Sequence, residues 1–592
     1  MAILPDFSAA TFIPGAPINN PYLPLIPGHV LSYKGDEIDP ETADITTERN
    51  DVFTTSAAFE VRGVSTTVIR DTVYEEDVIL EDTFDWYAQD SAGNVWYFGE
   101  IVVNYEYDDD GNFIGVNHEG QWSADDPGNQ PGWVMKATPE FGPAYYQEFA
   151  PGIAEDESIV AETGLSFNTP IGGFDDVIKT IDSSALSTGV EFKYYAPGVG
   201  GIAEVALAPD GTITSEVDIY RRGVVGQADP DDSDDVAPAL TALEESKTIE
   251  NLGEIRDLAT ADFAGTGTTK EVTVVGGSTD SDDALGAYFI DEATGAFGEA
   301  RILVADLSDA PSGSSVAVDV PDGQSLCLFL VRGTDQIGVD LEQYTDGGLH
   351  LKNLLTGAPA NLADPYAPTV VDDAGNILPI QPLSALGADD GGNLLNPAGS
   401  MQAIGLSSKV PGTGGIEIVG FEDRLNTSPD YDGDFNDAIV AVSEAPIAAE
   451  VLDQLIREAG GAQPEEIDRA LPSETGEDGE DGEDGVQDDD PTDNPTGESV
   501  KEEANDHHAS SELDNWMAGD TLEFADGALH TDGNSDDVGS RKEFFFADGD
   551  LGDLSRFAQF YDDHVDVPGW LFDGDAILKG PAPLGTDGFF LA

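Results

Sequence analysis

The strongest constraint on this chain is its excess of negative charge. Its 592 residues include 117 Asp and Glu against 24 Lys and Arg, which gives a formal net charge of −93 at pH 7. Self-repulsion of this size opposes a compact state unless cations bind or screen the carboxylates. The same charge disfavours nucleic acid and anionic membrane surfaces as partners. We therefore expect the chain to work either in high salt or in an extracellular space that contains millimolar calcium.

Apolar residues are nevertheless abundant enough to build cores. The sequence is 40% hydrophobic and 8% aromatic, and its length predicts about two to four domains. Short apolar runs separated by Gly and Asp turns, as in 314–331, are typical of antiparallel strands. We predict a mainly β, multidomain chain: an antiparallel β-rich N-terminal domain, a β-sandwich domain, an acidic disordered linker and a small C-terminal unit. The only cysteine, Cys327, excludes an intrachain disulfide and lies in an apolar run typical of a buried strand.

A short acidic loop supplies the candidate metal ligands. Residues 430–437 read Asp-Tyr-Asp-Gly-Asp-Phe-Asn-Asp, and Gly-Phe-Glu-Asp precedes them at 420–423. The alternating Asp side chains can direct several oxygens to one point, Gly433 permits a sharp turn, and apolar runs on either side predict strands that hold the loop. Several hard oxygen ligands suit Ca²⁺, although a solvated acidic hairpin is the alternative. The first-choice ligands are Asp430, Asp432, Asp434 and Asp437, followed by Asn436, Glu422 and Asp423.

An aromatic segment marks the first domain. Asp-Trp-Tyr-Ala-Gln-Asp at 85–90 and Gly-Asn-Val-Trp-Tyr-Phe-Gly-Glu at 93–100 predict an antiparallel hairpin with cross-strand aromatic pairs. Together with Tyr-Tyr-Ala-Pro-Gly-Val-Gly at 194–200, these motifs make residues 20–210 resemble an uncharacterised bacterial domain. The resemblance implies a domain and almost no function.

The second domain carries two further motifs. Residues 288–295 fit a Tyr-x-Ile-Asp-x-x-Thr-Gly pattern, and the Gly-Phe-Glu-Asp and Asp-x-Asp-Phe-Asn-Asp pair ends the region. This region resembles the bacterial domain-of-unknown-function family 4114. The resemblance implies an extracellular, calcium-stabilised module without a defined enzyme activity. The segment 426–429, Asn-Thr-Ser-Pro, departs from the Gly-rich connection that the family usually has.

The two ends of the chain bear on export. The N-terminal residues lack the basic region and apolar core of a secretory signal, and no run approaches the about 18 apolar residues of a membrane span. The last six residues, Asp-Gly-Phe-Phe-Leu-Ala at 587–592, resemble the uncleaved signal of type I secretion substrates. Combined with the acidic, calcium-type loop, this resemblance predicts a secreted protein that the type I secretion machinery exports.

Changes in composition divide the chain into seven predicted segments. No Lys or Arg occurs between residues 472 and 500, so like-charge repulsion is expected to keep that stretch extended. The segments are an extended N-terminal segment (1–30), a β-rich domain of unknown function (31–215), a linker (216–252), a β-sandwich calcium-binding domain (253–446), a helical spacer (447–471), the acidic linker (472–500) and a C-terminal unit with the secretion signal (501–592).

These features predict a secreted, calcium-binding, non-enzymatic surface or matrix protein whose folding is coupled to calcium after export. Its partners would be calcium ions and a cell-surface or matrix polymer. The alternative is a secreted hydrolase acting on polysaccharide or phosphoester, with its site near Trp86, Trp96 or Trp122 and beside Glu100 and His118. No nucleophile elbow, HExxH motif or phosphate loop supports an enzyme. A halophilic cytosolic protein is the third interpretation.

Overall fold

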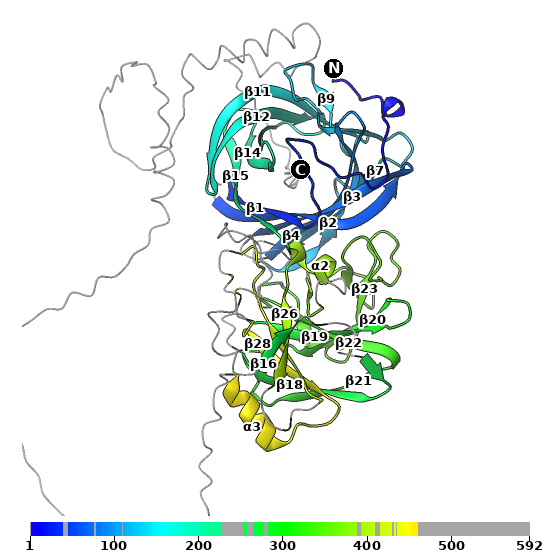
Figure 1. Ribbon diagram of the computed structural model, residues 1–592, viewed down its shortest axis with the longest axis vertical. Coiled ribbons are helices and arrows are strands. Elements are labelled where there is room, and N and C mark those ends of the chain that lie inside the picture. Colours follow the sequence, from blue (N-terminus) through cyan, green and yellow to red (C-terminus); the bar gives the residue numbers. More distant parts are fainter. Residues whose placement is uncertain are drawn as a thin grey trace, which may run out of the picture. The chain divides into compact units, whose positions relative to one another are not determined.

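The computed structural model describes two β modules (Figure 1). The described residues are 2–459, with gaps at 39–44, 76–77, 109–110, 226–252, 257, 259–263, 278–281, 335, 387–391, 409–411, 413–414, 429–430, 432 and 434. The predicted segments 472–500 and 501–592, with the secretion-type end of the chain, lie outside the described residues. Among the described residues strands predominate, and the predicted mainly β fold class is confirmed.

The first module is a single antiparallel sheet that curls almost into a barrel. Its sheet order is β10-β8-β5-β4-β3-β2-β1-β15-β14-β13-β12-β11-β9, with β6 and β7 paired to β5. The strands are β1 (His29–Ile38), β2 (Ile45–Val61), β3 (Val64–Glu75), β4 (Val78–Gln89), β5 (Val95–Tyr107), β6 (Phe113–Asn117), β7 (Trp122–Ser123), β8 (Gln130–Met135), β9 (Tyr145–Tyr146), β10 (Glu148–Phe149), β11 (Asp156–Thr169), β12 (Gly172–Ser184), β13 (Val190–Ala196), β14 (Gly200–Leu207) and β15 (Ile213–Val224).

The barrel closes at a short seam. The two ends of the sheet order, β9 and β10, follow each other in the chain, and they pair with β11 and β8 respectively. Figure 1 shows the strands curving around a common interior. Strand β15 runs to Val224, past the predicted boundary at residue 215, because Val217 and Ile219 continue the pairing with β1 and are buried.

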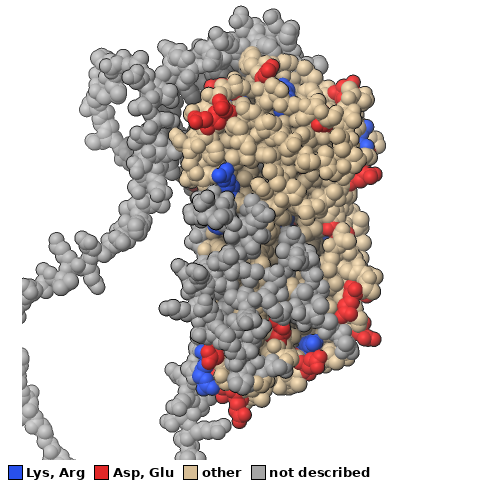
Figure 2. All heavy atoms as spheres, viewed as in Figure 1, with Lys and Arg blue, Asp and Glu red and all other residues tan. Residues whose placement is uncertain are grey.

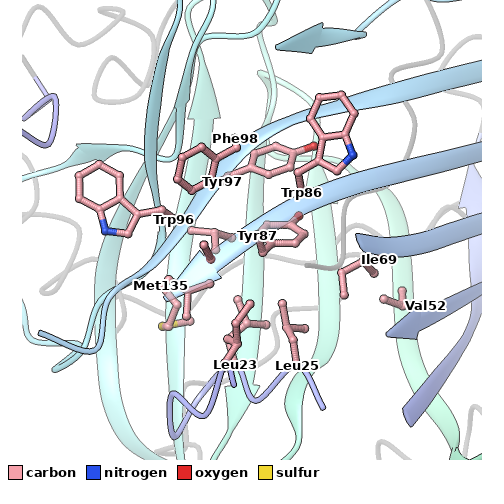
Figure 3. Close-up of a cluster of buried hydrophobic side chains, with 14 of the residues drawn as sticks. Leu23, Leu25, Val52, Ile69, Trp86, Tyr87, Trp96, Tyr97, Phe98 and Met135 are labelled. Atoms are coloured by element: carbon pink, nitrogen blue, oxygen red, sulfur yellow. The ribbon is translucent and has the colours of Figure 1, made fainter. Parts of the chain in front are cut away.

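The N-terminal segment and the aromatic hairpin together fill the barrel core. Leu23 and Leu25 come from the segment before β1 and lie in one buried cluster with Tyr87 and Tyr97 (Figure 3). The predicted hairpin is confirmed, because β4 pairs with β5 and the Tyr87 and Tyr97 rings stack across the strands at 4.7 Å. Near the start of the chain, the 3-10 helix η1 (Phe7–Ala9) sets Phe7 edge-on to the ring of Trp96.

The second module is a sandwich of two antiparallel sheets. One sheet has the order β16-β26-β27-β28-β18-β21 and the other β17-β22-β19-β20-β23-β24, with β25 paired to β22. The strands are β16 (Gly253–Arg256), β17 (Ala264–Thr266), β18 (Thr269–Gly276), β19 (Ala284–Asp291), β20 (Phe297–Val304), β21 (Ser315–Asp319), β22 (Asp322–Val331), β23 (Leu349–Lys352), β24 (Thr369–Asp372), β25 (Leu383–Ser384), β26 (Ala403–Ser408), β27 (Glu417–Phe421) and β28 (Ala438–Ser443).

Side chains from both sheets meet in the core of the sandwich. Leu285 and Leu328 from one sheet share a buried cluster with Val419 and Val440 from the other. Cys327 is fully buried in β22, as its apolar run predicts. The remaining described elements are the 3-10 helix η3 (Leu341–Tyr344), α2 (Gly392–Leu395), the 3-10 helix η5 (Pro397–Gly399) and α3 (Ala449–Glu458).

The helix α3 covers part of the β27 and β28 sheet. Leu455 and Ile456 are its buried residues, and they cluster with Ile418 and Ile439 of those strands. Apolar residues at helical spacing predict a helix in the segment 447–471. The described part of that helix is α3, and the residues after 459 are outside the described range.

The turn of the aromatic hairpin depends on Asp90. Its carboxylate accepts hydrogen bonds from the backbone N–H groups of Ala92 and Asn94 at 2.9 and 3.0 Å, and from the indole N–H of Trp96 at 2.8 Å. Trp96 is buried, so losing this acceptor would leave an unsatisfied donor in the core.

We predict that Asp90→Ala destabilises the protein by about 3 kcal/mol, because a buried indole loses a charged acceptor. Asp372→Ala is the matched control, since Asp372 caps a similar turn by accepting hydrogen bonds from Ala374 and Asn376. Urea unfolding followed by circular dichroism, which reports the strands of both modules, measures both variants. Equal losses in the two would contradict the role of the buried indole bond.

Candidate metal centre

Three carboxylates converge where two neighbouring strands of the sandwich meet. In the antiparallel pair β27 and β28, Phe421 lies opposite Ala438. Glu422 and Asp423 directly follow the first strand and Asp437 directly precedes the second, so all three lie at one edge of the sheet. One oxygen from each carboxylate lies within 4.8 Å of the oxygens of the other two.

Backbone hydrogen bonds fix this arrangement. The Asp437 N–H donates to the carbonyl of Phe421 at 3.1 Å, which continues the strand ladder. The Asp423 N–H donates to a carboxylate oxygen of Asp437 at 2.8 Å. The Glu422 N–H donates to the carbonyl of Gln402 at 3.0 Å. Each of the three residues is therefore placed by its main chain, before any ion is considered.

The returning end of the loop is anchored by Phe435. Its φ of 53° lies in the left-handed region, which is unusual for a residue other than glycine. Its ring is fully buried, and its N–H donates to Glu422 Oε2 at 3.4 Å. Gly433, with φ 67°, supplies the sharp turn that the sequence predicts. Burial of the ring offsets the backbone strain and keeps the loop against the sheet.

The electrostatics of the cluster favour a cation. Glu422 is 1% exposed and Asp423 is 5% exposed. Carboxylates that are buried close together are costly unless a positive partner accompanies them. The Arg424 guanidinium approaches Asp423 at 3.6 Å and offsets one of the three formal charges. A divalent ion is a partner that several carboxylate oxygens can share.

Two neutral side-chain oxygens near the cluster are also suitable ligands for a cation. Gln402 Oε1 and Asn426 Oδ1 are buried with no hydrogen-bond partner. Both residues belong to the same surroundings, because the Gln402 amide donates to the carbonyl of Arg424 at 3.2 Å and the Asn426 N–H to Ser400 Oγ at 3.0 Å. Carboxylate and amide oxygens are the donor set of Ca²⁺. The residues present therefore fit a hard divalent cation.

The predicted ligands divide into two groups. Glu422, Asp423 and Asp437 are brought together, and Asn436 directly precedes Asp437 in the chain. Asp430, Asp432 and Asp434 lie outside the described residues, so their role stays a prediction. The sequence ranks Glu422 and Asp423 behind the residues of 430–437, and the structure places both of them close to Asp437. The amides of Gln402 and Asn426 carry no motif, and only the fold relates them to the cluster.

The barrel buries carboxylates in a different way. Asp85 on β4 lies directly opposite Glu100 on β5, and both are almost fully buried. The Tyr97 hydroxyl donates to Asp85 at 2.6 Å. Burial raises the pKa of Asp85 to about 7 despite this hydrogen bond, and burial together with the Asp85 charge raises the pKa of Glu100 well above its usual range. The raised pKa values favour the protonated form of both groups, and for Asp85 this form predominates only below about pH 7.

The hydrolase alternative requires an open aromatic platform beside such acids. Trp86, Trp96 and Trp122 are 2%, 1% and 2% exposed, so their faces are covered by the core. The ring of His118 contacts the backbone carbonyl of Val102. Nothing in this part of the described barrel presents a carboxyl pair to a polymeric substrate, and the geometry does not favour the alternative.

Comparison with known proteins adds little on function. No protein-family model matches the chain, and no curated protein matches it. Two solved structures are similar to 36% of it, and in each case the match covers 99% of the other chain. One is a protein predicted to be exported, with a YmcC-like fold, from Bacteroides fragilis (13% identity, TM-score 0.19), and the other is a protein predicted to be a lipoprotein from Parabacteroides distasonis (12% identity, TM-score 0.19). Likeness of this degree supports no argument about activity.

The described helices also bear on membrane insertion. None of them combines the length and the apolar character that crossing a bilayer requires.

The raised pKa values predict how stability depends on pH. Burial raises the pKa of Asp85 and of Glu81 to about 7. An acid with a raised folded-state pKa stabilises the fold fully below its unfolded value of about 4, and that contribution is lost as the pH rises towards 7. In EDTA, we expect the melting temperature of the barrel to be higher at pH 5 than at pH 8.

Asp85→Asn should reduce this pH dependence, because the amide keeps an acceptor for Tyr97 and has no proton to lose. Glu60→Gln is the control, since Glu60 is exposed on β2. Differential scanning calorimetry at both pH values measures the effect. A pH profile that stays unchanged in Asp85→Asn would refute the assignment.

Proposed function

We propose that this chain is a secreted, calcium-binding, non-enzymatic surface or matrix protein whose folding is coupled to calcium after type I export. The observation that supports the proposal most strongly is the convergence of Glu422, Asp423 and Asp437 at one buried edge of the sandwich. Glu422 and Asp423 are buried and Asp437 is half-buried, which distinguishes them from the acidic groups that Figure 2 shows spread over the visible surface.

Two kinds of side chain would bind the calcium ion. Glu422, Asp423 and Asp437 would provide carboxylate oxygens, while Gln402 and Asn426 are the nearby amides with unsatisfied oxygens. A bound calcium ion would supply positive charge that lets these groups stay buried together. The main-chain hydrogen bonds of the loop bring the donors close to one another, where one ion can bridge them.

Linkage explains why calcium would matter for folding. An ion present at about 100 times its dissociation constant adds about 2.7 kcal/mol to stability for each site. Typical domains are stable by only about 5–15 kcal/mol. One or two sites therefore change the folded fraction substantially between a calcium-poor cytosol and a calcium-rich exterior. A chain that stays loose inside the cell is suited to passage through a secretion channel.

The charge of the chain agrees with this setting. A net charge of −93 is best tolerated where divalent ions are abundant, and it opposes binding to nucleic acid. The candidate partner is a cell-surface or matrix polymer, and the candidate export route is the type I secretion machinery.

We predict that EDTA lowers the melting temperature of the sandwich by about 5–10 °C relative to millimolar calcium. The double variant Glu422→Gln, Asp437→Asn should melt at the EDTA temperature in both conditions, because it keeps the hydrogen-bond acceptors and removes two charges. Asp322→Asn serves as a control at an exposed carboxylate of the same module. Asp432→Ala with Asp434→Ala tests the other predicted ligands.

Identical melting temperatures for the wild type with and without EDTA would refute calcium coupling. Cell fractionation tests the export proposal separately. Protein in the culture supernatant supports secretion, and protein confined to the cytosol supports the halophilic interpretation.

A further inference from the structure

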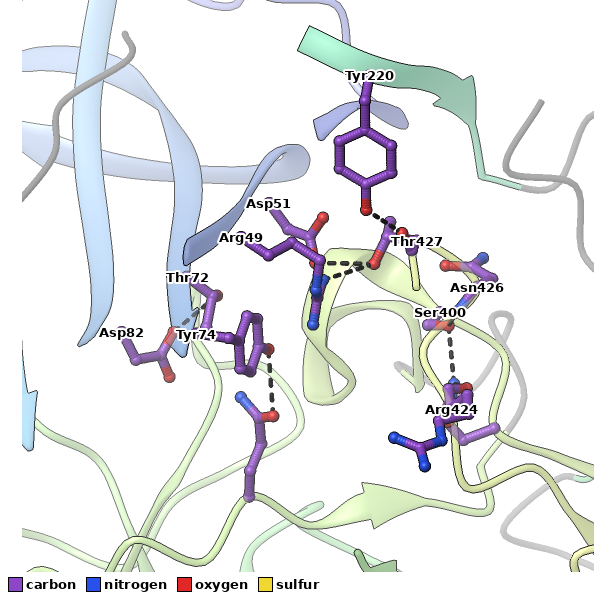
Figure 4. Close-up of polar contacts among 12 residues, drawn as sticks. Arg49, Asp51, Thr72, Tyr74, Asp82, Tyr220, Ser400, Arg424, Asn426 and Thr427 are labelled. Atoms are coloured by element: carbon purple, nitrogen blue, oxygen red, sulfur yellow. Dashed lines mark hydrogen bonds and ion pairs between the residues drawn. The ribbon is translucent and has the colours of Figure 1, made fainter. Parts of the chain in front are cut away.

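The loop that carries the candidate metal ligands also reaches the barrel. Thr427, four residues after Asp423, is fully buried. Its hydroxyl donates to Asp51 Oδ2 at 2.7 Å and accepts from Arg49 Nη1 at 3.1 Å (Figure 4). Its carbonyl accepts a hydrogen bond from the Tyr220 hydroxyl. One residue of the sandwich loop is thus bonded to strands β2 and β15 of the other module.

The barrel side of this contact is a buried ion pair. Arg49 and Asp51 contact each other, and their side chains are 8% and 0% exposed. A buried ion pair is stable only when its remaining hydrogen-bonding groups are satisfied. The Thr427 hydroxyl serves both charged groups at once, donating to the carboxylate and accepting from the guanidinium. Displacement of Thr427 would therefore remove a partner from each of two buried charges.

The residues that connect Asp423 to Thr427 are held in place by burial and by hydrogen bonds. Leu425 is fully buried in the sandwich core, and the Ser428 N–H donates to the Leu425 carbonyl at 2.7 Å. The Asn426 N–H is bonded to Ser400 Oγ at 3.0 Å. Because this short segment is held so firmly, a displacement of Glu422 or Asp423 would also displace the residues that follow. The position of Thr427 therefore depends on the position of the candidate ligands.

We propose that metal binding at Glu422, Asp423 and Asp437 is energetically coupled to the docking of the barrel through residues 423–427. The inference rests on the proposed calcium function. Without an ion, repulsion among three close carboxylates favours separating them, and this moves the loop away from the Arg49 and Asp51 pair. With an ion bound, the loop is held where the Thr427 hydroxyl bonds to both members of that pair.

The coupling is reciprocal and graded. Because binding free energies are linked, docking of the barrel must strengthen metal binding by the same factor as the metal strengthens docking. Contacts away from the loop also join the modules: the Tyr74 hydroxyl donates to Gln381 Oε1 at 3.2 Å, and the rings of Phe84 and Tyr366 lie 5.8 Å apart. Loss of the ion should therefore loosen the junction rather than abolish it.

The first experiment changes the barrel and measures calcium affinity at the sandwich. Tyr220→Phe removes one hydrogen bond to Thr427 without touching a candidate ligand. Titration calorimetry of the full chain should show calcium affinity weakened about 2- to 10-fold. Tyr22→Phe is the matched control, because the Tyr22 hydroxyl donates to the carbonyl of Asp176 inside the barrel module, and its affinity should equal that of the wild type. Thr427→Val, which removes the hydroxyl from the loop side, should weaken affinity in the same range.

The second experiment measures docking directly. The only cysteine of the chain is buried, so spin labels can be placed at Ser91→Cys on the barrel and Asp346→Cys on the sandwich, both exposed positions. Electron–electron distance measurements should give a narrower distribution in calcium than in EDTA. Tyr220→Phe should broaden the distribution in calcium.

The possible results distinguish failure of the coupling from failure of the proposed calcium function. One outcome would overturn the coupling and leave the proposed function intact. In that outcome the wild type binds calcium, the variants Tyr220→Phe, Thr427→Val and Tyr22→Phe bind it with equal affinities, and the measured distances do not depend on calcium. Absence of calcium binding to the wild type would overturn the proposed function and the coupling together.

Discussion

The cost of burying negative charge is the constraint on which this structure depends. Two different solutions occur in the two modules. In the barrel, acids such as Asp85 and Glu100 face each other across neighbouring strands, and desolvation raises their pKa and so favours their neutral form. In the sandwich, Glu422, Asp423 and Asp437 are brought together by main-chain bonds in a geometry that suits a cation. The first solution weakens as the pH rises, and the second requires ionised carboxylates, so the two modules should respond to acid in opposite directions.

Local features of the fold could be predicted from the sequence where short-range pairing decides them. The aromatic hairpin is one example, because Tyr87 and Tyr97 lie on either side of a turn whose geometry Asp90 fixes. Closure of the barrel could not be predicted in this way. It depends on β9 and β10, which are two residues long each and carry no alternating pattern. Long-range pairing across such short elements is set by the packing of the whole sheet.

The candidate metal centre could likewise be predicted only in part from the sequence. A local motif marks Glu422, Asp423 and Asp437, and strand pairing then brings them within ligand distance. Gln402 comes from the neighbouring strand edge and has no signal in the sequence. The departure of residues 426–429 from a Gly-rich connection gains a structural explanation, because Thr427 makes the contacts to Arg49 and Asp51. Glycine at this position would have no hydroxyl for the ion pair.

The seam of the barrel has a consequence for the order of folding. Ile3 forms a bridge with Tyr145: its N–H donates to the carbonyl of Ala144 at 2.8 Å, and its carbonyl accepts from the Tyr146 N–H at 3.1 Å. Residue 3 is thus bonded to a strand that lies more than a hundred residues later in the chain. The β1 to β5 meander can form from local contacts, whereas the wall can be completed only by a late, long-range step. Until that step is complete, strands β8 and β11 lack the partners that β10 and β9 provide.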